Sequence, residues 1–329
     1  MAVVGFVVLR GDLLRDLVGS PSPVGTSEST PGPTLRSTSS AVPALSPFTG
    51  RFGPSGRPVL AVKIDNVRPA RPQTGVDRAD VVYVEPVEGG LSRIMAIFSA
   101  ELPPRIGPVR SARESDLELL AQYGHPGLAY SGANRTVLSA IRDAPVVDLS
   151  PNRVPSAYSR TSSKAAPHNL LVNPRRLLEA AKGVSGATDI GFRFDALPTG
   201  QGTPTSRKVV RYGAASTTFS WSAQRRQWDV SLDGRAATTT DGARLRAATA
   251  VIQYTEITSS TLHDVLGNAT PYTHTVGSGS AVVLRDGVAI QARWSRPTAG
   301  TGTTFTTTTG APLPFAVGPV WVIYAKPPS

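Results

Sequence analysis

Two arginines, Arg110 and Arg113, stand where a helix is expected to begin, and their position is the strongest chemical signal in the chain. Ser111 and Glu114 have the spacing of a capping box, in which a Ser at the N-cap and a Glu three residues later satisfy backbone N–H groups. The pattern predicts a helix over 112–123 with Ser111 as its N-cap. Because the N-terminus of a helix is partially positive, a cation there is unfavourable by roughly 0.3–1 kcal/mol.

Arginines in this unfavourable position suggest an anion-binding site, because departures from local rules concentrate at functional sites. Free backbone N–H groups at a helix start and bidentate guanidinium groups both bind phosphate or carboxylate. The arginines that we expect to contribute are Arg71, Arg93, Arg110, Arg113 and Arg160. The alternative is that these arginines form internal ion pairs with carboxylates and only order the loops around them.

Four acidic residues, Asp65, Asp80, Glu85 and Glu88, flank predicted strands and a turn in the same part of the chain. They could meet at one edge of a sheet, where paired carboxylates serve acid–base catalysis or hold a hard cation. The alternative is that they pair with the arginines in a structural network. His168, in a loop before a predicted helix, could act as a base beside a carboxylate, or it could orient its loop by bonding the backbone.

Several chemistries are excluded by residues that the sequence lacks. It contains no cysteine, which removes disulfides, thiol catalysis and cysteine-based zinc sites. Its histidines show no metal-ligand spacing, and there is no nucleophile motif of the G-x-S-x-G or S-x-x-K type. The glycines match neither a Walker A loop nor a Rossmann fingerprint. We therefore expect no cofactor, no metal site and no assignable catalytic residue.

A set of short motifs in the first half of the chain resembles a known family. The motifs are Asp65-Asn66, Arg71-Pro-Gln-Thr-Gly75, Ala79-Asp80, Glu85, Glu88-Gly-Gly-Leu-Ser-Arg93, Gly107-Pro-Val-Arg-Ser-Ala-Arg113 and Ala166-Pro-His-Asn169. In combination they resemble the YerB-like putative lipoprotein family, strongly over residues 57–183 and weakly over 200–325. The resemblance implies a bacterial envelope-associated domain of unknown function with a C-terminal companion domain, and it implies no chemistry.

The motifs and the charged residues together define one predicted ligand-binding set. Its members are Asp65, Asn66, Arg71, Gln73, Glu85, Glu88, Arg93, Arg110, Arg113, Arg160, His168 and Asn169.

The chain of 329 residues is basic, with a formal net charge of +11 and a pI near 10.4. A basic surface attracts nucleic acid, anionic lipid headgroups or anionic cell-wall polymers, although a coding bias toward arginine would give the same excess. No run of five or more basic residues occurs, so a nucleic-acid-binding tail is not expected. The absence of cysteine also removes a lipid-modified residue, and in this the chain departs from lipoprotein members of the family.

The first 50 residues have the composition of an export segment followed by a stalk. Ala2–Leu9 is apolar but shorter than the about 20 residues that span a bilayer, and no basic region precedes it. We interpret residues 1–18 as a truncated signal or anchor, the alternative being a frayed N-terminus. Residues 19–50 are dominated by Ser, Pro, Thr and Gly, and they predict a disordered stalk.

Strand and helix patterns divide the remaining chain into two domains with a boundary at Leu197–Pro204. Residues 51–197 are expected to form a mixed α/β domain, with helices starting at Asn134 and Asn173 and strands at 59–64, 80–86, 92–98 and 128–130. Residues 204–329 are expected to form a smaller all-β domain, with strands at 208–212, 218–221, 227–231, 250–254, 281–285, 288–294, 303–306 and 320–324. The predicted fold class is therefore α+β.

These observations favour an exported, envelope-associated, non-enzymatic binding protein that uses its arginine-rich site for an anionic ligand or partner. The partner would be an anionic envelope polymer or a protein, and membrane contact is expected only through an N-terminal anchor. The alternative is a hydrolase that acts on an envelope glycan or a phosphate ester with Glu85, Glu88 and His168. A cytosolic nucleic-acid-binding protein is a third hypothesis that rests on charge alone. The sequence predicts no oligomeric state.

Overall fold

The computed structural model describes residues 43–54, 56–264 and 267–328. The predicted anchor at 1–18 and the first part of the predicted stalk, 19–42, lie outside these described residues.

The end of the predicted stalk, residues 43–50, is folded, so the prediction of disorder extends too far. Pro43–Leu45 (β1) pairs with Phe52–Pro54 (β2) in an antiparallel hairpin. Between them Phe48 is fully buried and packs edge-on against Tyr123, with ring centroids 5.3 Å apart. Burial of one aromatic ring outweighs the disorder-prone composition of its neighbours.

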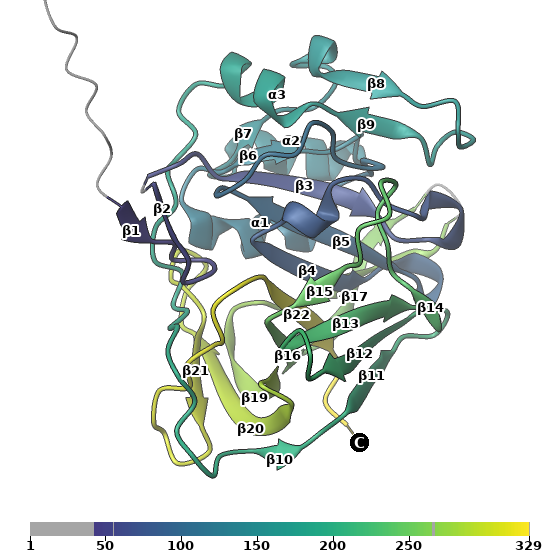
Figure 1. The fold of residues 1–329 in the computed structure, drawn as a ribbon. Helices are drawn as coiled ribbons and strands as arrows, with labels where there is room; N and C mark the ends of the chain where they lie inside the picture. Colours follow the sequence, from purple (N-terminus) through teal and green to yellow (C-terminus); the bar gives the residue numbers. More distant parts are fainter. Residues whose placement is uncertain (1–42, 55, 265–266, 329) are drawn as a thin grey trace, which may run out of the picture. The chain divides into compact units, whose positions relative to one another are not determined.

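A large sheet of eleven strands runs through both halves of the described chain (Figure 1). In spatial order its strands are β10 (Thr203–Pro204), β20 (Val288–Arg296), β19 (Gly277–Arg285), β16 (Thr249–Tyr254), β22 (Val320–Ala325), β4 (Val81–Pro86), β5 (Ser92–Phe98), β3 (Leu60–Asp65), β6 (Gly127–Ala129) and β7 (Val147–Asp148), with β21 (Thr304–Thr307) paired to β20. The parallel pair of β22 and β4 joins the two halves. The central strands are buried on both faces, and for that reason their sequences are apolar runs rather than alternating patterns.

Two short helices cover one face of this sheet. α1 (Glu114–Leu120) contributes Leu119 and Leu120 to a buried cluster, and α2 (Arg135–Asp143) contributes Val137 and Ile141 to the same cluster. The sheet contributes residues such as Tyr83 and Met95 from alternate positions of its strands.

A third helix and a second sheet cover the opposite face. α3 (Pro174–Ala180) buries Leu177 there, in a cluster that includes Phe219 and Trp228. Those two aromatics belong to the second sheet, whose strands are β11 (Arg207–Arg211), β12 (Ser216–Ser222), β13 (Gln227–Leu232), β14 (Arg235–Ala236) and β15 (Arg246–Ala247).

Smaller elements complete the described structure. Two further hairpins are β8 (Tyr158–Arg160) with β9 (Leu170–Val172) and β17 (Ile257–His263) with β18 (Ala269–Thr273). The 3₁₀ helices are η1 (Arg68–Ala70), η2 (Val76–Arg78), η3 (Glu88–Gly90), η4 (Ala121–Tyr123) and η5 (Pro155–Ala157).

The predicted α+β fold is confirmed, and the local patterns explain most of it. Asn134 caps α2 by accepting a hydrogen bond from the backbone N of Val137 at 2.8 Å. Asn173 caps α3 in the same way, with Pro174 at the first helical position. The hairpin of β17 and β18 was not predicted, because its strands are rich in Ser and Thr and show no apolar alternation.

Candidate ligand-binding site

Three charged residues lie in one row across neighbouring strands of the large sheet. Arg93 on β5 is the direct cross-strand partner of Asp65 on β3 and of Glu85 on β4. Directly paired residues project from the same face of a sheet. This row therefore lies on the face that α1 and α2 cover, next to the apolar positions Tyr83 and Met95.

Beneath α1 the charges form a closed cluster around Lys63. The Nζ atom of Lys63 is 2.6 Å from Oδ1 of Asp116 and 3.3 Å from Oε2 of Glu85, and all three side chains are buried. Burial raises the pKa of Glu85 to about 7, and the nearby Asp116 adds to this rise while Lys63 opposes it. The buried pair of Lys63 and Asp116 fixes α1 on the sheet. Glu85 adds a second contact to Lys63 through Oε2, while its buried Oε1 has no hydrogen-bond partner within the described residues.

The helix α1 begins later than the sequence predicted, and Ser111 is not its N-cap. The N-cap is Arg113, whose backbone N donates to Oδ2 of Asp116 at 2.7 Å. Upstream of it, Arg110 N donates to Lys63 O at 2.8 Å and Ala112 N donates to Gly132 O at 3.0 Å. These bonds keep residues 110–112 extended between other backbone segments, which prevents a helical turn at Ser111.

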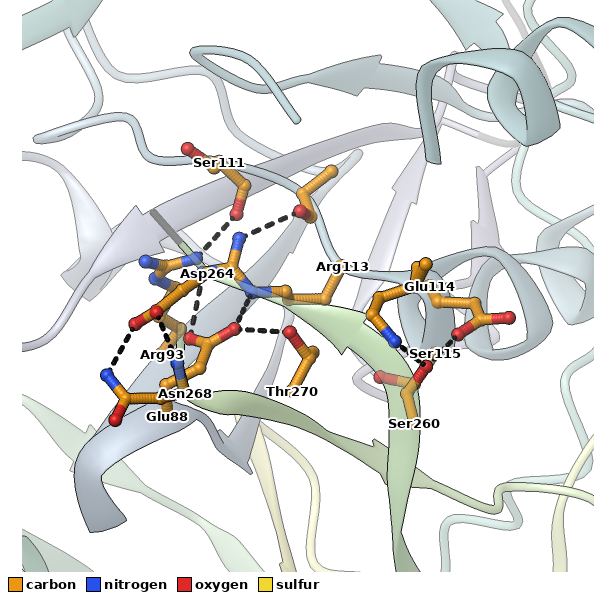
Figure 2. Close-up of polar contacts among 12 residues, drawn as sticks. Glu88, Arg93, Ser111, Arg113, Glu114, Ser115, Ser260, Asp264, Asn268 and Thr270 are labelled. Atoms are coloured by element: carbon orange, nitrogen blue, oxygen red, sulfur yellow. Dashed lines mark hydrogen bonds and ion pairs between the residues drawn. The ribbon is translucent and has the colours of Figure 1, made fainter. Parts of the chain in front are cut away.

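Above this row lies a pocket of about 560 Å³ that both halves of the chain line. From the first half come Asp65, Glu88, Arg93, Arg110 and Arg113, and from the hairpin of β17 and β18 come Leu262, His263, Asp264 and Thr270. Figure 2 shows the polar part of this arrangement, with Glu88 between Arg113 and Thr270.

Arg113 is held by a carboxylate. Its Nε and Nη2 atoms donate to the two oxygens of Glu88 at 2.7 and 2.8 Å, a bidentate pair. Thr270 donates to the same carboxylate at 2.7 Å. Burial would raise the pKa of Glu88, but the hydrogen bonds and charge of Arg113 outweigh it and hold this pKa below its ordinary value.

Arg93 differs from Arg113 because no carboxylate in the described part of the chain lies within ion-pair distance of its guanidinium. Its side chain is 9% exposed, and its hydrogen bond runs from Nη1 to the carbonyl of Ser111 at 3.0 Å. Burial, followed by repulsion from Arg113 and Arg110, lowers the pKa of Arg93 to about 10, while the charges of Glu88 and Asp65 act in the opposite direction. A buried cation is unfavourable unless it is paired, and within the described residues Arg93 has a backbone carbonyl rather than a carboxylate as its hydrogen-bond partner.

Arg110 lies near a carboxylate that it shares with a histidine. Its Nε atom is 3.0 Å from Oδ2 of Asp65, and the same oxygen is 2.8 Å from Nδ1 of His168. The Nε atom of Arg110 is buried and makes no aligned hydrogen bond within the described residues, so the contact with Asp65 is electrostatic only. Arg110 is therefore only partly satisfied by the protein.

The remaining predicted residues lie elsewhere. Arg71 donates to Asp233 at 2.8 Å and also contacts Asn66, and Gln73 Nε2 donates to Asn66 Oδ1 at 3.0 Å. Arg71 and Gln73 line a separate depression of about 200 Å³.

Arg160 is exposed and donates to Asn169 at 2.7 Å. Neither of these two residues lines the large pocket, and neither do Glu85 and His168. The predicted set thus divides into the pocket, the closed cluster, the Asp233 cluster and the β8–β9 hairpin.

The sequence did not indicate the contribution of the second half of the chain. Glu118 of α1 accepts hydrogen bonds from Tyr272, Thr275 and Val276, and these bonds fasten the β17–β18 hairpin to the helix. Burial would raise the pKa of Glu118, but the same hydrogen bonds keep this pKa below its ordinary value. Ser260 donates to Glu114 at 2.8 Å (Figure 2). These partners are more than 140 residues apart in sequence, so no local pattern could have revealed them.

The described residues contain no group of three or more His, Asp or Glu side chains placed to hold a metal ion. Among the helices in this part of the chain, none is long and apolar enough to cross a membrane.

Comparison with known proteins places these observations in a family. Residues 48–187 match the model of the N-terminal domain of a protein of unknown function (DUF3048), and residues 208–322 match the model of its C-terminal domain. A curated relative, "Putative lipoprotein YerB" of Bacillus subtilis (strain 168), is 50% identical over 58 residues, which span 18% of this chain and 17% of the relative.

A crystal structure of the YerB protein from Bacillus subtilis has the same fold. It aligns with a TM-score of 0.74 over 86% of this chain and 96% of that chain, at 21% sequence identity. The resemblance that the motifs indicated is therefore confirmed. Since the two family models together match most of its length, the chain belongs to the DUF3048 family of proteins of unknown function.

Proposed function

We propose that the protein is a non-enzymatic, extracytoplasmic binding protein of the cell envelope, and that its large pocket binds the anionic group of a ligand. The observation that carries this proposal is Arg93, which is buried in the pocket wall without a carboxylate partner among the described residues. Arg110, which lines the same pocket, has a buried Nε without an aligned hydrogen bond. An anion between these two guanidinium groups would supply the missing acceptor.

The pocket favours one anionic group over a polyanion. Its lining contains as many acidic as basic side chains, since Asp65, Glu88, Glu114 and Asp264 accompany the arginines and His263. These carboxylates repel an extended phosphate chain, whereas a single carboxylate or phosphate can reach Arg93. Hydrogen bonds to a charged group contribute about 1.5–3 kcal/mol each before competition with salt.

The rest of the ligand would contact apolar surface. Val67, Val87, Leu91, Val137 and Leu262 line the pocket beside the arginines. Pockets that bind small molecules typically combine such apolar walls with a few placed polar groups. The ligand class supported best is therefore a small molecule, or the end of a polymer, with one anionic group on a less polar body.

The hydrolase alternative has less support from the geometry. Glu85 lies in the closed cluster with Lys63, and Glu88 is held by Arg113, so neither carboxylate is free to move a proton in the pocket. His168 contacts Asp65 and does not line the pocket. A general base and its substrate must come within hydrogen-bond reach, and these three residues face different neighbours.

The envelope location is supported by the relative's name and by the N-terminal composition. The Bacillus subtilis relative is named "Putative lipoprotein YerB", and the apolar run Ala2–Leu9 followed by a Ser/Pro/Thr-rich segment is the order expected of an exported protein.

Thermal unfolding in different salts tests the anion site. Phosphate and sulfate should raise the Tm of the full chain more than chloride at equal ionic strength, and Arg93→Gln should remove that difference. Arg175→Gln is the matched control, because Arg175 is exposed at the start of α3 and lies outside the pocket. The control should keep the full anion effect.

Two results would count against this function. If phosphate and chloride act equally on the unchanged protein, the pocket has no anion site. If Arg93→Gln and Arg175→Gln reduce the phosphate effect alike, the stabilisation comes from the net charge rather than from the pocket.

A further inference from the structure

The exposed large apolar side chains of the described residues gather at one place. Among the described residues three large apolar side chains are exposed, Leu45 at 56%, Phe52 at 81% and Val317 at 56%. Leu45 and Phe52 are direct cross-strand partners in the β1–β2 hairpin, so they project from the same face. The loop of Val317 is bonded to this hairpin, since Gly318 N donates to Thr49 O at 2.8 Å. All three apolar residues line one depression of about 630 Å³.

The hairpin that presents this patch is firmly attached. Phe48 in its turn is fully buried against Tyr123. Gly50 has a φ of 66° and lies so close to Phe194 that a Cβ on it would be 2.5 Å from the Cβ of Phe194. The exposure of Leu45 and Phe52 is therefore a property of a packed element. Single exposed apolar residues are common on proteins, but a cluster of them marks an interaction surface.

Charged residues, arginines among them, lie beside the patch. Arg225 and Arg226, in the turn between β12 and β13, line the same depression, as does Arg285. Two acidic residues, Asp195 and Asp286, also line it, and Asp286 is shared between Arg226 at 3.1 Å and Arg285 at 2.8 Å. Arg285 is buried, and Asp286 pairs with both Arg285 and Arg226. Arg225 is exposed and has no carboxylate partner among the described residues, so it is the cation of this rim that is open to a partner.

We propose that Leu45, Phe52 and Val317, with Arg225 and Arg226 around them, form a surface that docks on an anionic lipid bilayer. Apolar side chains flanked by arginine match the acyl boundary and the headgroups of such a bilayer. The patch also adjoins Pro43, where residues 1–42 join the described chain. An N-terminal segment held at a membrane would keep the patch near the lipid, and a tethered contact needs little affinity of its own.

Other occupants fit the patch less well. In a symmetric pair of chains the same patch would face itself and would bring the arginines of both copies together, which is unfavourable. The apolar run at residues 2–9 contains no acidic residue that would explain the arginines.

A fluorophore placed on the patch tests this proposal directly. The chain has no cysteine, so Val317→Cys allows one environment-sensitive dye to be attached to the full-length protein. Vesicles of phosphatidylglycerol and phosphatidylcholine should shift its emission to the blue, and vesicles of phosphatidylcholine alone should do so much less. The control is the same dye on Ser162→Cys, an exposed position between β8 and β9, which should not respond. Adding Phe52→Asp to the Val317→Cys protein should weaken the vesicle response about tenfold or more.

Three outcomes would overturn the proposal. The first is that the dye on Val317→Cys does not respond to vesicles, or responds no more than the dye on Ser162→Cys. The blue shift appears without vesicles and grows with protein concentration, which would identify a second copy as the occupant. The shift appears without vesicles at every concentration and is lost when residues 2–9 are deleted, which would identify the chain's own apolar run.

Discussion

Two charged regions lie side by side on one face of the large sheet, and they differ in how their cations are paired. In the closed cluster Lys63 contacts both Asp116 and Glu85, and the Lys63 side chain is fully buried. In the pocket wall Arg93 is nearly as buried but has no carboxylate partner within the described residues. The two regions are two residues apart along β3, where Lys63 is followed by Asp65, the cross-strand partner of Arg93.

This difference in charge pairing distinguishes the closed cluster, which has a structural role, from the pocket wall, which is the candidate binding site. A buried pair stabilises its surroundings only when its geometry and hydrogen bonds are complete, and the closed cluster meets this condition for Lys63 and Asp116. A buried cation without a partner reduces the stability of the folded state, and such groups concentrate where a ligand completes them. Arg113 belongs with the scaffold because Glu88 holds it, although it lines the same pocket as Arg93.

The largest expected effect is the loss of a scaffold arginine. Arg113→Met should lower the free energy of unfolding by about 3–5 kcal/mol, because it leaves the carboxylate of Glu88, 6% exposed, without its cation. Urea denaturation measures this loss. The double variant Arg113→Met with Glu88→Gln should recover most of it. If the single variant is as stable as the unchanged protein, the two arginines do not differ and the comparison fails.

The corresponding change in the pocket should act in the opposite direction. Arg93→Met removes a buried, unpaired charge while keeping a long side chain, so the free energy of unfolding in chloride should rise by about 1–3 kcal/mol. Urea denaturation in chloride gives this value. A loss of several kcal/mol would mean that the protein itself already pairs Arg93.

The closed cluster should make stability depend on pH. The pKa of the Glu85 carboxyl is raised from its ordinary value of 4.5 to about 7 in the folded protein. Between these two pH values the folded protein therefore keeps a proton on Glu85 that the unfolded chain has lost. The free energy of unfolding should therefore fall as the pH rises, by at most about 1.4 kcal/mol per pH unit, and the fall should end above pH 7. Asp80, whose pKa burial raises to about 6, contributes in the same direction at lower pH.

The pH interval from 6 to 7 isolates Glu85. Glu85→Gln should flatten the pH dependence there, whereas Asp80→Asn should flatten it mainly below pH 6. Stability that rises through this interval in the unchanged protein would show that Glu85 is ionised throughout and that Lys63 dominates the cluster.

The smallest expected effect is at Ser111. Because its carbonyl rather than its hydroxyl accepts the hydrogen bond from Arg93, Ser111→Ala should change the free energy of unfolding by less than about 0.5 kcal/mol. Asn134→Ala, which removes a true N-cap, should lower it by about 0.5–2 kcal/mol. Equal losses in the two variants, measured by urea denaturation, would restore the capping role of Ser111.

What the sequence could predict depends on the range of the interaction. The caps at Asn134 and Asn173 depend on neighbours within three residues, and both were predicted correctly. The buried strands were recognisable from their apolar runs. The prediction that Ser111 is an N-cap was wrong, because backbone hydrogen bonds to the distant residues Lys63 and Gly132 hold that part of the chain outside the helix.

The grouping of the arginines depends on contacts that sequence patterns do not contain. Arg71 pairs with Asp233, 162 residues away, and this contact removes it from the group that was predicted. Similarly, Thr270 reaches Glu88 across 182 residues and completes the pair with Arg113. Residue types indicated that arginines and carboxylates would meet, but only the folded chain determines which arginine is left without a partner.

The most direct test of this account is to observe the arginine side chains themselves. In an NMR spectrum of the Nε–Hε groups, assigned with single Arg-to-Gln or Arg-to-Met variants, phosphate should shift the signals of Arg93 and Arg110 in a saturable way. The signal of Arg113, held by Glu88, and that of the exposed Arg175 should stay in place. If phosphate shifts none of them, or shifts Arg175 as much as Arg93, the pocket does not bind an anion and Arg93 has no role as a binding residue.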